Sequence, residues 1–225
     1  MIRKLPRWVE IGGFWLALVA GAVNAIGLLG FEHQAVSHLT GTSSLIALSL
    51  VNLVIPVALH LLLIMLFFVA GAMLSGAWIG NVALKMGRRY SVALCIEAGL
   101  LLAAMVVLGR GSNAGHYLAS AACGLQNGMV STYSGAIVRT THMSGLFTDL
   151  GTMLGARLRG SRLDRRRVLL YCLLILGFIA GGCVGALAFH YYHFNALALP
   201  AAGTLLLAAV YWMFRLGRGP ARPAR

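Results

Sequence analysis

Six long apolar stretches constrain this chain more than any other feature of its sequence. Each contains about 20 residues, the length at which an α-helix crosses the roughly 30 Å hydrocarbon layer of a bilayer. Hydrophobic residues make up 60% of the chain and charged residues only 10%, which excludes an ordinary soluble domain. The stretches cover residues 8–30, 57–80, 91–109, 117–138, 168–189 and 196–214. We therefore expect an all-α, polytopic protein that lies in a lipid bilayer.

Two shorter apolar stretches, residues 41–55 and 145–158, are too short to cross comfortably as helices. Each directly follows a five-residue polar phrase, "SHLTG" from Ser37 or "THMSG" from Thr141. The phrases supply side-chain oxygens that can cap a helix start: Thr40, Thr42 and Ser43 in the first, Thr141 and Ser144 in the second. Gly41 and Gly145 allow a turn and a close approach to the backbone. We expect two re-entrant half-helices; helices lying flat at the bilayer surface are the alternative.

Basic residues are concentrated between the apolar stretches and at both ends of the chain, the pattern that orients membrane proteins. With six spans, both termini and all but one of the 18 Lys and Arg residues fall on one side, and Arg110 is the exception. With eight spans, in which residues 41–55 and 145–158 also cross, Arg139 and the basic residues near Lys85 change sides. The charge distribution favours six spans in the cytoplasmic membrane, with both termini cytoplasmic.

The second half of the chain repeats the first. An offset of 103 or 104 residues aligns Gly21 with Gly124, Asn24 with Asn127, His38 with His142, Thr40 with Ser144 and Gly41 with Gly145. Each half, residues 8–109 and 113–214, holds three spans, so the second half must enter the membrane from the opposite face. We expect a 3+3 inverted repeat in one membrane domain over residues 1–225, with a basic cytoplasmic tail at 215–225. Eight spans would instead form a parallel 4+4 repeat.

A half-helix that begins inside the membrane presents free amides and the positive end of its dipole, which suit an anion or an oxygen-rich solute. The imidazoles of His38 and His142 would lie at the same place and can donate or accept hydrogen bonds. In inverted-repeat transporters the solute binds near the midplane, between the repeats. The two phrases are therefore the candidate binding site.

Other polar residues lie within the expected spans, where they are costly and usually face the interior or a pathway. They are Asn24, Glu97, Gln126 and Asn127, with Asp149 one turn into the second short helix. Glu97 and Asp149 can hold a coupling proton or cation, although Asp149 can equally complement a helix dipole and Glu97 can bond a neighbouring helix. Asn24 and Asn127 either face each other and touch a solute or join helices. Arg139 either pairs with Asp149 or anchors its span at the cytoplasmic side.

No catalytic motif stands out, and the four cysteines lie in apolar stretches without metal-type spacing. We therefore expect no enzyme activity, no cofactor, no bound metal and no nucleic-acid partner. Small residues four apart, Gly71 with Ser75 and Gly181 with Gly185, predict close helix packing or a dimer seam.

The segments "AGAVNAIGLLGF", "SHLTGT" and "CGLQNGMVSTYSGAIVRTTHMSGLFTDLG" resemble the YoaK-like family of uncharacterised bacterial integral membrane proteins, and the resemblance covers nearly the whole chain. It implies a multi-span protein, with transport suspected from its shape and no substrate known. The family usually has Asp at the position of Asn24 and Asn at that of Thr42, so the resemblance implies that this chain lacks two groups able to hold a cation. Coupling would then fall to Asp149 or Glu97, or be absent.

The leading functional hypothesis is a small secondary transporter or channel for a small polar or anionic solute, with homodimerisation compatible with six spans. The expected binding residues are Asn24, His38, Thr40, Gly41, Thr42, Gln126, Asn127, Thr141, His142, Ser144 and Gly145, and the expected coupling or gating residues are Glu97, Arg139 and Asp149. A membrane scaffold, sensor or partner subunit is the alternative. An intramembrane enzyme with His38, His142 and Asp149 as ligands is a third class.

Overall fold

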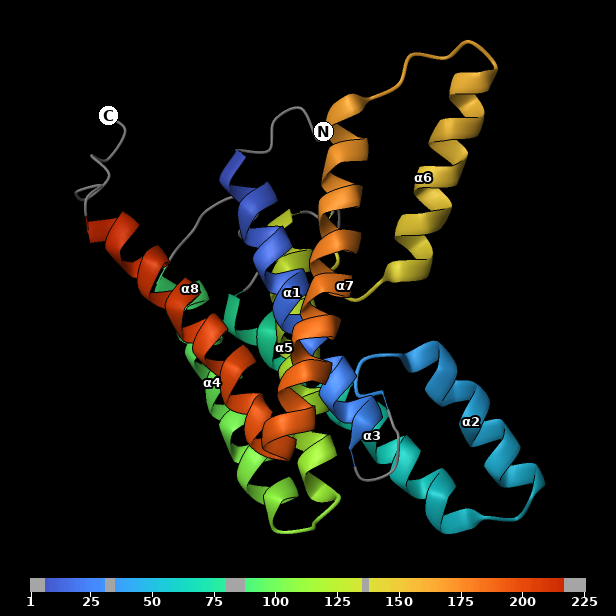
Figure 1. Ribbon diagram of the computed structural model, residues 1–225, viewed down its shortest axis with the longest axis vertical. Helices are drawn as coiled ribbons and strands as arrows, with labels where there is room; N and C mark the ends of the chain where they lie inside the picture. The colour runs from blue at the N-terminus through green and yellow to red at the C-terminus, as the bar shows by residue number, and fades with distance from the viewer. Residues whose placement is uncertain (1–6, 31–34, 80–87, 135–137, 217–225) are drawn as a thin grey trace.

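The computed structural model describes residues 7–30, 35–79, 88–134 and 138–216, and these form helices joined by short connections (Figure 1). The helices are α1 Arg7–Leu29, α2 Leu39–Val51, α3 Ile55–Ile79, α4 Arg88–Gly109, α5 Ala114–Ser134, α6 Met143–Leu158, α7 Arg165–Tyr192, the short 3-10 helix η2 His193–Leu197, and α8 Ala198–Leu216. The six expected spans coincide with α1, α3, α4, α5, α7 and α8, and the two short stretches with α2 and α6. The expected span end at Gly80, the basic residues Arg3, Lys4 and Lys85, and tail residues 217–225 lie outside the described residues.

Within the described part of the chain, four helical segments are long and apolar enough to cross a membrane. They are Trp8–Leu29, Ile55–Ile79, Arg89–Gly109 and Arg165–Met213, the last of which contains both α7 and α8. The other long helix, α5, is more polar, because it carries buried groups such as His116, Ser120 and Gln126. A polar helix is tolerated at membrane depth where neighbouring helices cover it. The apolar helices indicate a helical membrane protein.

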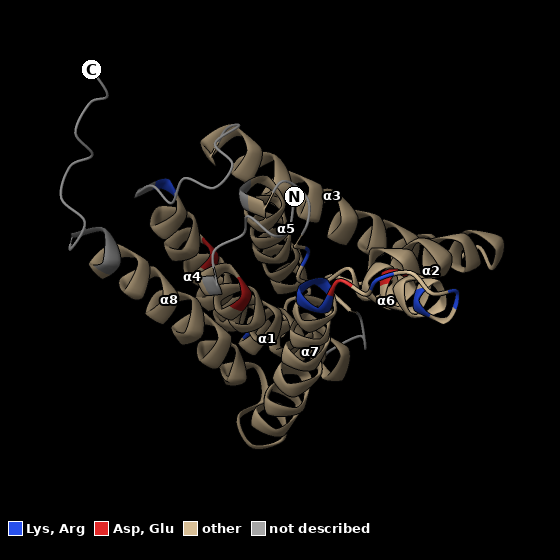
Figure 2. Ribbon diagram, turned by 90° about the horizontal axis from the view of Figure 1, so that it is seen from above, with Lys and Arg blue, Asp and Glu red and all other residues tan. Residues whose placement is uncertain are grey.

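The helices form three groups across the molecule. Figures 1 and 2 show α4 and α8 on one side, α2 and α6 on the other, and α1, α3, α5 and α7 between them. Helix α1 packs along α7 and helix α3 along α5, while α4 contacts both α5 and α8. In contrast, α2 packs against α3 and α6 against α7. The two short helices therefore lie outside the packed body.

Glycines bring the central helices into backbone contact, as the small-residue pattern predicts. A methyl group added to Gly21 on α1 would overlap the carbonyl of Phe178 on α7, and one added to Gly124 on α5 would overlap the carbonyl of Phe68 on α3. The reverse contacts also match, since Gly181 lies against Leu18 and Gly71 against Ala121, again through carbonyl groups. The α1–α7 and α3–α5 pairs thus use corresponding residues of the two halves.

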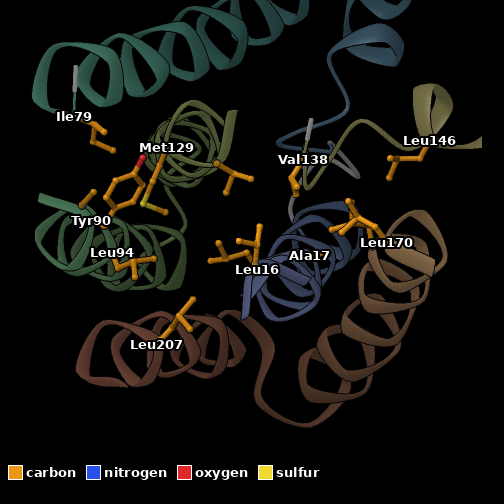
Figure 3. Close-up of a cluster of buried hydrophobic side chains, with 14 of the residues drawn as sticks. Leu16, Ala17, Ile79, Tyr90, Leu94, Met129, Val138, Leu146, Leu170 and Leu207 are labelled. Carbon is orange, nitrogen blue, oxygen red and sulfur yellow. The ribbon is translucent and has the colours of Figure 1, made fainter. Parts of the chain in front are cut away.

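A buried apolar cluster joins most of the helices at the end of the bundle where α1 begins (Figure 3). It includes Leu16 of α1, Leu94 of α4, Met129 of α5, Leu170 of α7 and Leu207 of α8, among others. At the same end, Arg166 Nε donates to Glu10 Oε1 at 2.7 Å and joins the first turns of α7 and α1. Figure 2 shows basic residues at the start of α7 and in the connection before it.

Candidate functional site

Asn24 holds the segment that leads into α2. Its side chain is almost completely buried on α1, and its Oδ1 accepts hydrogen bonds from the backbone N–H and the hydroxyl of Ser37, at 3.3 and 3.0 Å. Ser37 directly precedes His38, the residue before the first turn of α2. The amide of Asn24 therefore fixes where α2 begins.

Asn127 has the same role in the second half. Its Oδ1 accepts hydrogen bonds from the hydroxyls of Thr141, at 3.1 Å, and Thr140, at 3.4 Å, while its Nδ2 donates to the carbonyl of Cys123 at 2.9 Å. Thr141 precedes His142, the residue before α6. Each asparagine thus bonds the phrase of its own half, so the amides join chain segments, the second of the two roles considered for them.

His38 and His142 are the N-cap residues of α2 and α6, and the backbone angles of the two caps agree closely, with φ −92° and ψ 65° at His38 and φ −88° and ψ 58° at His142. Neither ring bonds a helix amide. The expectation that Thr and Ser residues cap the helices is therefore wrong. Thr42 lies inside α2, where its hydroxyl bonds the carbonyl of His38 at 3.1 Å. Thr141 precedes the cap of α6 and bonds Asn127 instead.

The imidazole of each capping histidine folds back over the first turn of its helix. A side chain at Gly41 would overlap the ring of His38, and a side chain at Gly145 would overlap the ring of His142. Glycine is thus required where another group approaches the backbone closely. Both rings are exposed on the surface of this chain.

The other phrase residues, Thr40 and Ser144, are exposed within the first turns of α2 and α6. Figures 1 and 2 show both short helices on the same side of the body. In Figure 1 they begin at mid-height and run in opposite directions. The predicted phrases therefore lie on one side of the molecule, on helices that each pack against a different partner.

Gln126 lies between α5 and α1 and is completely buried. Its Nε2 donates to the carbonyl of Leu16 at 2.6 Å and to Thr140 Oγ1 at 3.4 Å. These bonds occupy its Nε2 within the protein, so Gln126 connects α5 with α1 and with the residue that precedes the second phrase.

Glu97 is 1% exposed, in the middle of α4. Its Oε2 has no hydrogen-bond partner among the described residues, and the carboxyl lies near the thiol of Cys123 on α5. An acid in such a place is costly unless it is protonated or meets a ligand. Among the described residues, Oε2 therefore makes no hydrogen bond to a neighbouring helix.

Asp149 is exposed on α6 and accepts a hydrogen bond from the Tyr171 hydroxyl at 3.0 Å. The Tyr171 oxygen in turn accepts one from Arg167 Nε at 3.0 Å. Asp149 lies beyond the first turn of α6, which contains no acid, so complementing the dipole at that turn does not explain it. Arg139 is exposed, and the ion pair found among the described residues joins Glu10 and Arg166 rather than Arg139 and Asp149.

The structure adds a polar cluster that the sequence analysis missed. His60 on α3 and His116 on α5 are buried with their ring centroids 5.6 Å apart, and His60 Nδ1 shares a 2.8 Å hydrogen bond with the Tyr117 hydroxyl. Asking which histidines fall within the expected spans, by the same argument that selected Glu97, would have singled out His60, whereas His116 directly precedes the expected span 117–138. No group of three metal-binding side chains occurs in the described ranges.

Comparison with known proteins gives one family. The family described as "Protein of unknown function (DUF1275)" matches residues 12–210, nearly the whole chain. Its description assigns no activity and includes neither the YoaK-like name nor a bacterial source. No curated protein and no solved structure matches the chain.

Proposed function

We propose that this chain, which belongs to the DUF1275 family of proteins of unknown function, is a small secondary transporter or channel of the cytoplasmic membrane. The observation that carries the proposal is the pair of short helices α2 and α6, each of which begins at a histidine at mid-height and runs opposite to the other (Figure 1). Oppositely directed half-helices are a recurrent device for binding a solute near the midplane of a membrane. As a transporter the protein would carry out no covalent chemistry.

A 3+3 inverted repeat explains why the two halves use corresponding contacts. The caps at His38 and His142 have nearly equal backbone angles, and Gly21 meets Phe178 as Gly124 meets Phe68. Such pairs are expected when two homologous halves interlock, each lending a helix to the other. The match supports the inverted repeat over two unrelated halves.

The positions of the basic residues in the structure also support the six-span topology. The start of α1, the start of α7 and the end of α8 lie at the same end of the molecule in Figure 1. The basic residues from Arg157 to Arg167 also belong to this end, whereas Arg110 lies at the turn after α4. Because basic segments stay in the cytoplasm, we propose that both termini are cytoplasmic and that α2 and α6 are re-entrant.

The proposed solute is small and polar or anionic, and it binds at the two helix starts. The first-turn amides of α2 and α6 have no acid beside them, and the dipole ends attract negative charge. The exposed imidazoles of His38 and His142 add hydrogen-bonding groups. Thr40 and Ser144 offer exposed hydroxyls in the same turns. Glu97 is buried, and its Oε2 has no hydrogen-bond partner among the described residues, so this carboxyl group is the proposed site for a coupling proton.

A non-transport scaffold or sensor is the second candidate, and a specific observation favours it. The amide groups of Asn24, Gln126 and Asn127 all bond other parts of the protein. If the two capping histidines likewise only stabilise their helices, the polar phrases contribute to helix packing and bind no solute.

A thermal-shift screen of the purified protein against small anionic and polar metabolites separates the two functions. A transporter predicts a compound that raises the melting temperature of the wild type but not of His142→Ala. His190→Ala, which alters an exposed histidine near the end of α7, should keep the response. The compound should then cross reconstituted liposomes. Absence of any stabilising compound, together with lower stability of His142→Ala, would favour the scaffold.

A further inference from the structure

The second short helix, α6, lies outside the packed body and is attached to it through few side chains (Figure 1). Leu146 is the side chain that α6 buries, and Leu150 and Met153 pack half-buried against the apolar cluster. Side-chain carbons added at Gly151 or Gly155 would meet nothing within 4 Å in the described structure. A helix with so small an attached area depends strongly on each single contact.

A chain of two hydrogen bonds joins the middle of α6 to the first turns of α7. The Tyr171 hydroxyl donates to Asp149 Oδ2 at 3.0 Å, and the same oxygen accepts from Arg167 Nε at 3.0 Å. The guanidinium carbon of Arg167 also lies 5.7 Å from the centre of the Tyr171 ring, within the range of a cation–π contact. Tyr171 is 2% exposed, so packing holds its ring in place between the two charged groups. Hydrogen bonds to ionised groups are roughly twice as strong as neutral ones.

The other charged groups near the start of α7 have partners of their own. Arg166 bonds Glu10 on α1. Asp164 caps α7 by accepting from the backbone N–H of Arg167 at 3.3 Å, which fixes where Arg167 lies. In the part of the chain that the structure describes, the charged residue linked to Asp149 is therefore Arg167, through the hydroxyl between them.

The first half of the chain has hydrocarbon side chains at the corresponding positions. These positions are counted from the aligned caps of α2 and α6 and from the aligned glycines Gly71 and Gly181. In place of Asp149, Tyr171 and Arg167, the first half has Leu45, Leu61 and Val57. Hydrocarbon makes no hydrogen bonds, so the attachment of α2 to α3 does not depend on charge at these positions. The two short helices thus correspond in sequence but are attached by different forces.

We infer that Asp149, Tyr171 and Arg167 form a charge-dependent latch that holds the second half-helix, and with it the helix start at His142, against α7. An ionised Asp149 accepts the Tyr171 hydroxyl strongly, whereas a neutral side chain of the same shape accepts it weakly. The position of α6 therefore responds to the charge of one side chain, and that of α2 does not. In the proposed transport cycle, α6 is the half-helix that moves. This role in gating rests on the proposed function, whereas the latch itself does not.

Hydrogen exchange of the full chain in detergent, measured by mass spectrometry, tests the latch. Tyr171→Phe removes the central hydroxyl and should raise the exchange rate of the α6 amides about tenfold, while the α2 amides keep the wild-type rate. Asp149→Asn keeps the shape of the side chain and one acceptor oxygen, so it should raise the rate about threefold through loss of charge. Asp149→Glu retains the charge and should keep α6 close to the wild-type rate.

Thr148→Val is the matched control, because the Thr148 hydroxyl bonds the carbonyl of Ser144 at 2.9 Å, within α6 itself. It should leave the exchange of α6 unchanged. Asp149 is exposed, so Asp149→Asn still decides the matter if Tyr171→Phe, which alters a buried residue, is misfolded. Equal α6 rates in the wild type and Asp149→Asn, equal acceleration of α2 and α6, or equal rates in Asp149→Asn and Asp149→Glu would overturn the latch.

The latch and the proposed transport function can fail separately, because hydrogen exchange requires no solute. A compound that stabilises the wild type and crosses liposomes, with no change of α6 exchange in Asp149→Asn, would support transport and refute the latch. Faster exchange of α6 alone, with no stabilising compound in the thermal-shift screen, would support the latch and count against transport.

Discussion

The carbonyl of Phe178 on α7 lies directly against Gly21 on α1 and leaves no room for a side chain at residue 21. The same relationship joins Phe68 on α3 to Gly124 on α5. Close backbone contacts of this kind let two membrane helices pack by van der Waals forces where no hydrophobic effect holds them together. The central four helices therefore depend on two glycines that occupy equivalent places in the two halves.

Substitution of either glycine should destabilise the fold. Gly21→Ala and Gly124→Ala force a carbonyl and a methyl group apart, and overpacking of this kind costs about 1–3 kcal/mol. Gly76→Ala on α3 is the matched control, because a side-chain carbon there meets nothing within 4 Å. Unfolding in mixed micelles, followed by tryptophan fluorescence, measures the difference. Equal stability of Gly21→Ala and Gly76→Ala would contradict the packing described here.

The two asparagines give a reciprocal prediction. Asn24→Ala removes the acceptor of two hydrogen bonds from Ser37, and Asn127→Ala removes the acceptor of the Thr141 hydroxyl. Each loss should cost about 1–3 kcal/mol locally, because a donor that is buried at Ser37 and half-buried at Thr141 is left unsatisfied. Hydrogen exchange should therefore accelerate at the start of α2 in the first variant and at the start of α6 in the second. Each variant is the control for the other, and faster exchange at both starts in both variants would show that the halves are not held separately.

Membrane topology can be tested at two exposed turns. Ser112 lies between α4 and α5, and Ser161 lies between α6 and α7. With six spans the two turns lie on opposite sides, whereas with eight spans both lie in the cytoplasm. In a background without the native cysteines, an impermeant maleimide should label Ser112→Cys on intact cells and Ser161→Cys only after permeabilisation. A Ser112→Cys protein that is protected on intact cells would rule out the six-span topology.

The buried histidine cluster also predicts a stability effect. Tyr117→Phe deletes the hydroxyl that shares a 2.8 Å hydrogen bond with His60 Nδ1 and should lower the unfolding free energy by about 0.5–1.5 kcal/mol. Tyr191→Phe changes a tyrosine that is 68% exposed and should have no effect. Thermal unfolding of the two variants beside the wild type is the measurement. A Tyr117→Phe protein as stable as Tyr191→Phe would mean that this bond contributes nothing.

Much of the fold could be predicted because its cause is local. Residues 145–158 were expected to form a short helix, and α6 is Met143–Leu158. Likewise, residues 91–109 were expected as a span, and α4 is Arg88–Gly109. The length of an apolar stretch and the polar residues at its two ends set such helix boundaries, and neither depends on the rest of the molecule.

The candidate site could be predicted less fully than the helices, because the hydrogen-bond partners of a side chain depend on which residues lie near it in space. The phrases around His38 and His142 were singled out correctly as helix starts, yet the capping residues are the histidines rather than Thr42 or Thr141. Asp149 was considered a partner of Arg139, but it bonds Tyr171, which is 22 residues away on α7. A side chain with several possible partners takes the one that helix packing brings within reach.

The sequence by itself determined that this is a helical membrane protein and where its helices lie, since apolar length is a property of the chain alone. Only the tertiary structure decided that Asn24 bonds Ser37 and Asn127 bonds Thr141, that Glu97 Oε2 has no hydrogen-bond partner among the described residues, and that His60 bonds Tyr117. The physical reason is that hydrophobic burial acts on whole helices, whereas a hydrogen bond requires two particular atoms to lie about 3 Å apart.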